Sequence, residues 1–342
     1  MPQTKNTSDA YEAFAAALKT GQIGTFYILH GEERYLLENS LVTLRKLICP
    51  DGLGGFNYKR FEGRDLTADD LSDAIDMMPV FAERTLIEVH DFDIFANIDR
   101  KEQILRPISD LPEYVCLVLI YDTVPYKPDT RTKLDKDILK YAQVVEFCTQ
   151  EQTKLIKWIF RHIEANGKTI SKADAEYLAL ITDGLMTTLD GEIEKVSAFS
   201  KDPAITRSDI DAVVVPTLDA VAYQLTDAIL AKKHNAAMSI LDELLRMREA
   251  PQKILFSISL KLRQLLAARA YLESSKDKSA LMKTCDIRYE FQARNLIDTA
   301  RKVSLAECRD AVLACADAAL ALNSESEPES RLIELIARLA FL

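Results

Sequence analysis

The stretch Thr25-Phe-Tyr-Ile-Leu-His-Gly-Glu-Glu-Arg-Tyr-Leu-Leu-Glu38 decides the fold of this chain. It predicts a buried strand, a turn that begins at Gly31 and an amphipathic helix. A nucleotide-binding α/β protein places its phosphate loop at such a junction, with the pattern GxxxxGK[ST], so that backbone N–H groups and a lysine surround the phosphates. Here Glu32 and Glu33 follow the single glycine, and two carboxylates repel phosphates. The sequence therefore predicts a degenerate P-loop position at Gly31, Glu32 and Glu33, in a protein that works by binding.

The composition is that of a globular chain with two or three domains, because 342 residues exceed the usual size of one domain. The net charge of −10 argues against a protein whose main work is to grip nucleic acid, which usually needs a basic face. No apolar run reaches the length of about 18 residues that a membrane span needs. The N-terminal residues lack the apolar core of a secretion signal, and the six scattered cysteines favour buried thiols in a reducing compartment. We therefore expect a cytoplasmic protein with no membrane partner.

The first half of the chain alternates between strand patterns and helix patterns. The apolar runs of β character are Phe26–His30, Phe56–Phe61, Leu86–His90, Val115–Tyr121 and Val144–Phe147. The helical patterns between them are Tyr35–Ile48, Ala68–Met78, Arg100–Leu111 and Lys133–Tyr141. This alternation predicts a mostly parallel sheet covered by helices on both faces, within a domain that spans residues 1–148.

From Gln150 onward the strand signals disappear and helical periodicity takes over. A compact helical unit is expected over residues 149–215, ending near Val215-Pro216. Residues 216–342 are predicted to be all helix, because apolar residues recur there at steps of three and four. The expected fold class is an α/β domain with a parallel sheet, followed by a small helical domain and an all-α domain.

No set of residues has the spacing of an active site or a metal centre. The motifs GxGxxG, CxxC, HExxH and GxSxG are all absent. Asp122 follows a strand where a Walker B acid would lie, but the second acid is missing, which favours a loop role over a magnesium ligand. His30 and His90 both end predicted strands and could meet at one edge of the sheet, although packing at strand ends is the default interpretation. We therefore predict no catalytic residue, no cofactor and no metal site.

An apolar turn separates the predicted helix Ala68–Met78 from the predicted strand Leu86–His90. Pro79 disfavours helical geometry in the residue before it, so the helix is expected to end around Met78. Met77, Met78, Val80 and Phe81 then share a short turn at the edge of the sheet. Composition alone favours packing of these side chains into the core. The alternative is an exposed apolar wedge, since Met adapts to irregular surfaces and Phe can anchor in the pocket of a partner.

Several segments, taken in order, resemble the delta subunit family of bacterial DNA polymerase III clamp loaders. The matching segments are Tyr27–Glu38, Phe56–Phe61, Met78–Arg84, Cys116–Ile120, Val144–Phe147, Trp158-Ile159 and Leu189–Lys195, together with the leucine-rich C-terminal third. The resemblance implies a AAA+-like architecture in which residues 1–148 form the α/β domain, 149–215 a helical lid and 216–342 a helical collar. It also implies a subunit of the DNA polymerase holoenzyme, a nucleotidyltransferase complex, that has no active site of its own.

The resemblance also implies a function. In this family the subunit binds the ring-shaped sliding clamp, the beta subunit, and opens one interface of the ring for loading onto primed DNA. The contact falls on Val80 and Phe81, with Met77 and Met78 beside them, and Val80 is a smaller wedge than the leucine often found there. The implied partners are the clamp, the other loader subunits in a hetero-pentamer, and primed DNA only within that complex.

Two other hypotheses stay open at this point. One is a AAA+-type nucleotide-binding regulator with an atypical phosphate loop. The other is a stand-alone nucleic-acid-binding protein, which the acidic net charge disfavours.

Overall fold

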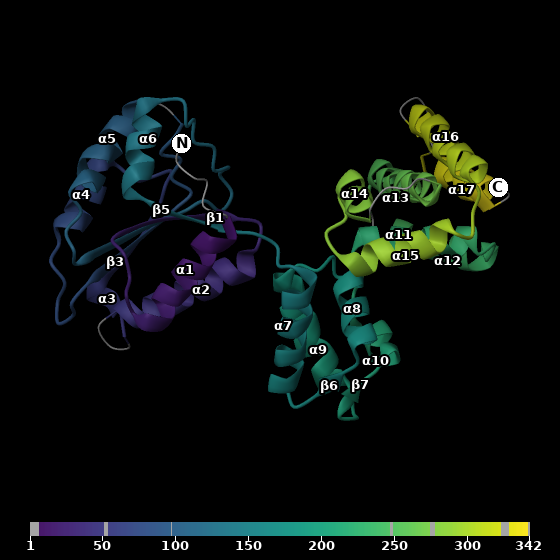
Figure 1. Ribbon diagram of the computed structural model, residues 1–342, viewed down its shortest axis with the longest axis horizontal. Coiled ribbons are helices and arrows are strands. Elements are labelled where there is room, and N and C mark those ends of the chain that lie inside the picture. The colour runs from purple at the N-terminus through teal and green to yellow at the C-terminus, as the bar shows by residue number, and fades with distance from the viewer. Residues whose placement is uncertain are drawn as a thin grey trace. The chain divides into compact units, whose positions relative to one another are not determined.

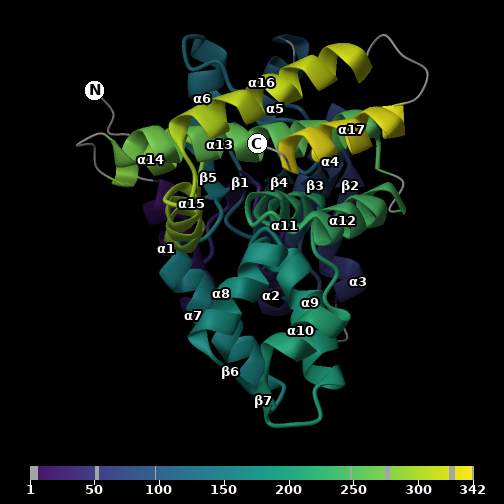
Figure 2. The same cartoon turned by 90° about the vertical axis from the view of Figure 1, so that its right-hand side faces the viewer.

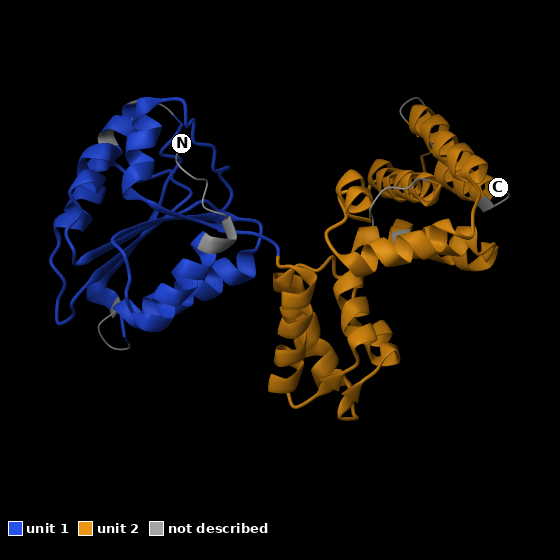
Figure 3. Cartoon of the chain, in the orientation of Figure 1, with its two compact units in different colours: residues 1–149 blue, residues 150–342 orange. Residues whose placement is uncertain are grey.

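The computed structural model describes residues 7–50, 54–96, 98–246, 249–273, 278–322 and 328–340. The chain forms two compact units, Met1–Thr149 and Gln150–Leu342 (Figure 3). The division of the second unit into 149–215 and 216–342 stays a prediction.

The first unit is built on a five-stranded parallel sheet with the strand order β2-β3-β4-β1-β5. The strands are β1 (Phe26–Gly31), β2 (Tyr58–Glu62), β3 (Thr85–His90), β4 (Val115–Ile120) and β5 (Gln143–Phe147). Every residue of β3 and β4 is buried, as expected for strands that are covered on both faces. The predicted parallel sheet is confirmed.

Helices cover both faces of this sheet (Figure 1). Tyr27 and Leu29 of β1 pack toward α1 (Thr7–Thr20) and α2 (Arg34–Ile48). Neighbouring residues in the same strand, such as Ile28, face the opposite way because side chains alternate along a strand. That opposite face is covered by three helices, α4 (Ala68–Asp76), α5 (Ile98–Ser109) and α6 (Lys133–Tyr141).

Two features of this unit differ from the sequence prediction. The strand predicted at Phe56–Phe61 begins only at Tyr58, because residues Gly54–Asn57 form the short helix α3. Helix α1 is not among the predicted helices. The buried Phe14 of α1 packs against Tyr27, with a distance of 4.9 Å between the ring centroids.

The second unit is helical, with one exception. Its first helices are α7 (Gln152–Ala165), α8 (Lys172–Ile181), α9 (Met186–Phe199) and α10 (Arg207–Val213). Two short strands, β6 (Thr169–Ile170) and β7 (Ala204–Ile205), pair in parallel among them. The expectation that no strand follows Gln150 is therefore wrong, because strands of two residues are too short to leave a pattern in the sequence.

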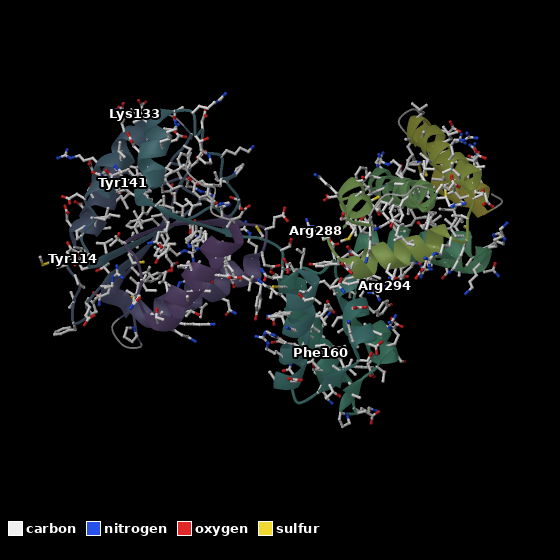
Figure 4. All side chains as sticks on the ribbon, in the orientation of Figure 1. Tyr114, Lys133, Tyr141, Phe160, Arg288 and Arg294 are labelled. Atoms are coloured by element: carbon white, nitrogen blue, oxygen red, sulfur yellow. The ribbon has the colours of Figure 1, made fainter. Side chains whose placement is uncertain are left out.

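The remaining helices form a bundle around α13 (Pro251–Leu272). They are α11 (Leu218–Leu230), α12 (His234–Arg246), α14 (Lys278–Thr284), α15 (Glu290–Ala300), α16 (Leu305–Leu322) and α17 (Pro328–Ala340). Figure 2 shows α16 and α17 lying along α13. The bundle contacts the preceding helices through Arg294, labelled in Figure 4, whose Nη1 lies 3.8 Å from the Oε2 of Glu176. The buried Tyr289 also donates its hydroxyl to the carbonyl oxygen of Gly184 at 3.3 Å.

The cysteines follow the prediction only in part. Cys116, Cys285, Cys308 and Cys315 are buried. Cys148 is exposed, because it comes directly after the end of the edge strand β5, so the prediction of a buried thiol is wrong there. Within the described ranges no single helix is long and apolar enough to cross a membrane. Only α10 and α11 taken together meet that criterion, and they are bent by 118°.

Candidate functional site

The turn after β1, where a P-loop would hold phosphate, is closed by the end of β5. Gly31 has φ 135°, and a Cβ atom added there would lie 2.3 Å from the carbonyl oxygen of Phe147. That same carbonyl accepts a hydrogen bond of 2.9 Å from the N–H of Glu33. In a P-loop the N–H groups of this turn point at the phosphates. Here one of them is already bonded to the protein.

Charged side chains complete the closure of this turn. Glu33 is the N-cap of α2 and is 1% exposed, so its carboxylate lies inside the protein. Arg34, at the start of α2, makes an ion pair with the carboxylate of Asp122 and also donates to its carbonyl oxygen. The charge of Arg34, which follows the P-loop position in the sequence, is thus neutralised by an acid of the same unit. Asp122 has the loop role that the sequence favours.

Asp91, the residue after β3, holds the loop that contains Asp122. Its Oδ1 accepts from the N–H groups of Asp122 at 2.8 Å, Thr123 at 2.7 Å and Val124 at 3.1 Å. Burial alone would raise the pKa of Asp91, but the hydrogen bonds from Thr123 and Val124 and the charge of Arg34 hold that pKa below its usual value. Asp91 is therefore a structural anion that fixes this edge of the sheet.

The two histidines at strand ends do not form a pair. His30 lies in β1 and stacks on Tyr126, with 4.1 Å between the ring centroids. His90 lies in β3, with its Nε2 3.6 Å from the Oε2 of the buried Glu88. Strand β4 separates β1 from β3, so the two side chains belong to different clusters. Among the residues that the structure describes, no group of three or more His, Cys, Asp or Glu side chains could hold a metal ion.

The apolar turn between α4 and β3 lies at the opposite edge of the sheet. It precedes the amino end of β3, whereas the P-loop position follows the carboxyl end of β1, and the strands are parallel. Its four candidate residues are all exposed: Met77 at 44%, Met78 at 74%, Val80 at 39% and Phe81 at 88%. The structure thus brings the predicted residues together on the surface, and packing into the core is not what these side chains do.

Phe81 is also unusual in its backbone. Its φ is 53°, in the left-handed region that residues with a Cβ atom rarely adopt. Helix α4 ends at Asp76, two residues earlier than predicted, and residues 77–84 are neither helix nor strand. The Phe81 side chain therefore faces solvent, and the backbone conformation of Phe81 costs free energy.

Two polar side chains hold this turn in place. The Asn57 carboxamide bonds Val80 twice, since its Oδ1 accepts from the Val80 N–H at 2.7 Å and its Nδ2 donates to the Val80 carbonyl oxygen at 2.8 Å. Arg84 donates through Nη2 to the carbonyl oxygens of Gly24 at 2.9 Å and Val115 at 3.2 Å. The turn is thus fixed at Val80 and at Arg84, and the exposed Phe81 lies between these two points.

Asn57 and its neighbour Phe56 are the residues that the sequence does not reveal. Phe56 is 62% exposed and directly precedes Asn57, which is 1% exposed. Their alternation with Tyr58 favours a strand, yet Asn57 ends the short helix α3. An asparagine just before a strand is a turn signal, but nothing in the sequence says that its partner lies 23 residues away.

Comparison with known proteins gives a consistent result. Residues 27–148 match the family described as DNA polymerase III, delta subunit, and residues 219–338 match the family described as the C-terminal domain of that subunit. DNA polymerase III subunit delta of Bacillus subtilis is 28% identical over 302 residues, which cover 86% of this chain and 86% of the relative. The solved structure of the Bacillus subtilis DNA clamp loader delta protein covers 97% of this chain and 100% of its own, with a TM-score of 0.58 and 22% identity.

Proposed function

Because this chain belongs to the DNA polymerase III delta subunit family, we propose that it binds the ring-shaped sliding clamp and opens one interface of the ring. The contact is made by the turn from Met77 to Phe81, which we call the wedge turn, with Phe81 as its anchor. The ring is opened so that it can be loaded onto primed DNA.

The observation that carries this proposal is the exposure of the wedge turn. Phe81 is 88% exposed, and Met78 is 74% exposed. Together with Met77 and Val80 they form a contiguous run of large apolar side chains at one edge of the sheet. Apolar patches of this kind mark surfaces that bind other proteins, and an aromatic anchor buried in a pocket of the partner can supply much of the binding energy there.

The mechanism follows from differential affinity. A ligand shifts an equilibrium between two states only by binding one of them more tightly than the other. Phe81 opens the ring if the pocket that it fills is better formed in the open ring than in the closed one. No covalent chemistry is required of this chain.

The closed P-loop position supports the proposal that this subunit does not bind ATP itself and relies on the ATP cycle of neighbouring subunits. The Glu33 N–H is bonded to Phe147, and Arg34 is paired with Asp122, so neither is available to a phosphate. We infer that the chain works in the cytoplasm in a hetero-pentamer with other loader subunits, and that it meets primed DNA only within that complex. The acidic net charge of −10 fits a subunit that does not grip DNA alone.

The test is the affinity of the Phe81→Ala variant for the sliding clamp of the same organism, measured with the clamp immobilised on a sensor surface. Loss of an aromatic anchor costs about 2 kcal/mol or more, which raises Kd by about thirtyfold. Because Phe81 is 88% exposed, the melting temperature should stay unchanged.

Phe199→Ala is the matched control. Phe199 is also an exposed phenylalanine, at 50%, but it lies in the second unit. We expect this variant to bind the clamp like wild type. If Phe81→Ala and Phe199→Ala bind the clamp equally well, the wedge turn is not the contact.

A further inference from the structure

The wedge turn depends on a side chain outside it. Within the described ranges, Asn57 is the one residue whose side chain bonds the Val80 backbone, and it bonds both the N–H and the carbonyl oxygen. Its carboxamide thereby pairs with Val80 much as a neighbouring strand would. Asn57 is 1% exposed, so its side of these two bonds is shielded from water, which strengthens them.

Asn57 is itself rigidly placed. The backbone carbonyl oxygen of Asn57 accepts a hydrogen bond of 3.4 Å from the Sγ of Cys49, the residue just after the end of α2. The next residue, Tyr58, starts β2 and donates its hydroxyl to the Oε2 of Glu88 at 2.9 Å. Glu88 also accepts from Arg45 at 2.8 and 2.6 Å. Asn57 directly precedes the first residue of β2, which the buried Glu88 network fixes, so the Val80 backbone that Asn57 bonds is held relative to the sheet.

Phe81 needs such support. A left-handed conformation with φ 53° is unfavourable for a residue with a Cβ atom, and a side chain that is 88% exposed gains little packing in return. Backbone strain of this kind persists only where the surrounding structure fixes it. The residue directly before Phe81 is Val80, and its two backbone groups are the ones that Asn57 fixes.

We infer that Asn57 is a positioning residue for clamp binding: by bonding the backbone of Val80, it holds Phe81 in the conformation that enters the clamp. This inference rests on the proposed function of the wedge turn. Holding a binding segment in its bound conformation raises affinity, because less conformational entropy is lost on binding. Without Asn57 the turn would relax, and Phe81 would have to be ordered by the clamp itself.

The experiment measures clamp affinity for Asn57→Ala, Phe81→Ala and the double variant. We expect Asn57→Ala to weaken binding about tenfold. In the Phe81→Ala background the same substitution should weaken binding less than about threefold, because there is no anchor left to position. Equal losses in the two backgrounds would overturn the inference, since they would mean that Asn57 acts through the general fold.

A second readout uses the chain without the clamp. Hydrogen exchange of the Val80 amide should become faster in Asn57→Ala, while the amide of Leu117, in the central strand β4, keeps its protection. If Asn57→Ala does not fold, Asn57→Asp serves instead, because it keeps the acceptor for the Val80 N–H and loses only the donor to the Val80 carbonyl. An unchanged exchange rate at Val80 in folded Asn57→Ala would overturn the inference. Asn57→Asp keeps the bond to the Val80 N–H, so its readout is clamp affinity, and wild-type affinity in that variant would overturn the inference as well.

Tyr114→Phe is the matched control. Tyr114, labelled in Figure 4, donates its hydroxyl to the carbonyl oxygen of Ile75 at 3.4 Å, in the last turn of α4. The Tyr114→Phe substitution removes a hydrogen bond close to the wedge turn without changing those of Val80, and we expect this variant to bind the clamp with wild-type affinity. The affinities of these variants also separate the two proposals, the clamp contact at Phe81 and the positioning role of Asn57. Full clamp affinity in Phe81→Ala contradicts the proposed function, whereas weak binding by Phe81→Ala with full affinity in Asn57→Ala contradicts only the positioning role.

Discussion

The P-loop position and the wedge turn lie at opposite edges of one sheet, and each contains a residue with positive φ. In the first that residue is Gly31, with φ 135°, and the backbone of Phe147 leaves no room for a side chain. In the second it is Phe81, with φ 53° and 88% of its side chain in solvent. Glycine adopts such a backbone at little cost, whereas phenylalanine does so at a cost that its exposed side chain does not recover. The fold alone accounts for the first turn, whereas for the second we propose a partner.

The two edges also differ in the group that holds them. Asp91 accepts three backbone N–H groups of residues 122–124 beside the P-loop position. Asn57 bonds both backbone groups of Val80 in the wedge turn. The first holder is an acid that titrates, and the second is an amide that does not. We call the end of the sheet at the P-loop position the closed edge and the end at the wedge turn the open edge. The hydrogen bonds that hold the closed edge should therefore weaken in acid, whereas those that hold the open edge should not.

The strongest way to break this comparison is to add a methyl group at the closed edge. Gly31→Ala should destabilise the chain by about 3 kcal/mol, because overpacking and an unfavourable backbone add together. The new Cβ atom would meet the Phe147 carbonyl oxygen at 2.3 Å, and that backbone cannot move without disturbing the pairing of β1 with β5. Urea unfolding followed by circular dichroism measures the loss.

Gly55→Ala provides the control for this prediction. A Cβ atom at Gly55 would meet nothing within 4 Å, so the same chemical change has room there. We expect its effect to stay within about 0.5 kcal/mol. Equal stability of the two variants would show that β5 does not close the P-loop position.

A smaller effect is expected from placing glycine at the open edge. Phe81→Gly should leave the chain as stable as wild type or stabilise it by about 0.5 kcal/mol, since relief of the left-handed backbone outweighs the greater freedom of the unfolded chain. Phe81→Ala keeps the unfavourable backbone and should not gain this stability. Thermal unfolding of the two variants measures the difference. A loss of more than about 1 kcal/mol in Phe81→Gly would instead mean that the side chain packs against the fold.

The sequence predicts the closed edge better than the open one, and the reason is physical. A fully apolar run such as Val115–Ile120 can only be a buried strand or helix, and a strand followed by a glycine turn and an amphipathic helix has few alternatives. The two carboxylates Glu32 and Glu33, at a position where they would repel a phosphate, can be read directly from the sequence. Local chemistry is enough there.

The open edge depends on contacts between distant residues. The apolar composition of Met77–Phe81 by itself favours packing into the core, and only the tertiary structure shows that these side chains face solvent. Asn57 was hidden for the same reason, because its hydrogen bonds span 23 residues and its neighbours imitate a strand. The likeness of Met78–Arg84 to the delta subunit family, rather than periodicity, pointed to the wedge turn.

The smallest expected effect concerns acid, and it separates the two holders directly. The pKa of Asp91 is lowered in the folded chain, so its charge stabilises the fold above the unfolded value of about 3.9. That stabilisation is lost as the pH falls below about 4 and through the folded pKa, because a protonated Asp91 accepts the three N–H groups less well. The stability difference between wild type and Asp91→Asn should therefore shrink between pH 7 and about pH 3.5 in urea unfolding. The difference between wild type and Asn57→Ala should stay constant over the same range, since a carboxamide does not titrate. If both differences shrink together, the acid acts on the whole sheet, and the closed and open edges are not held independently.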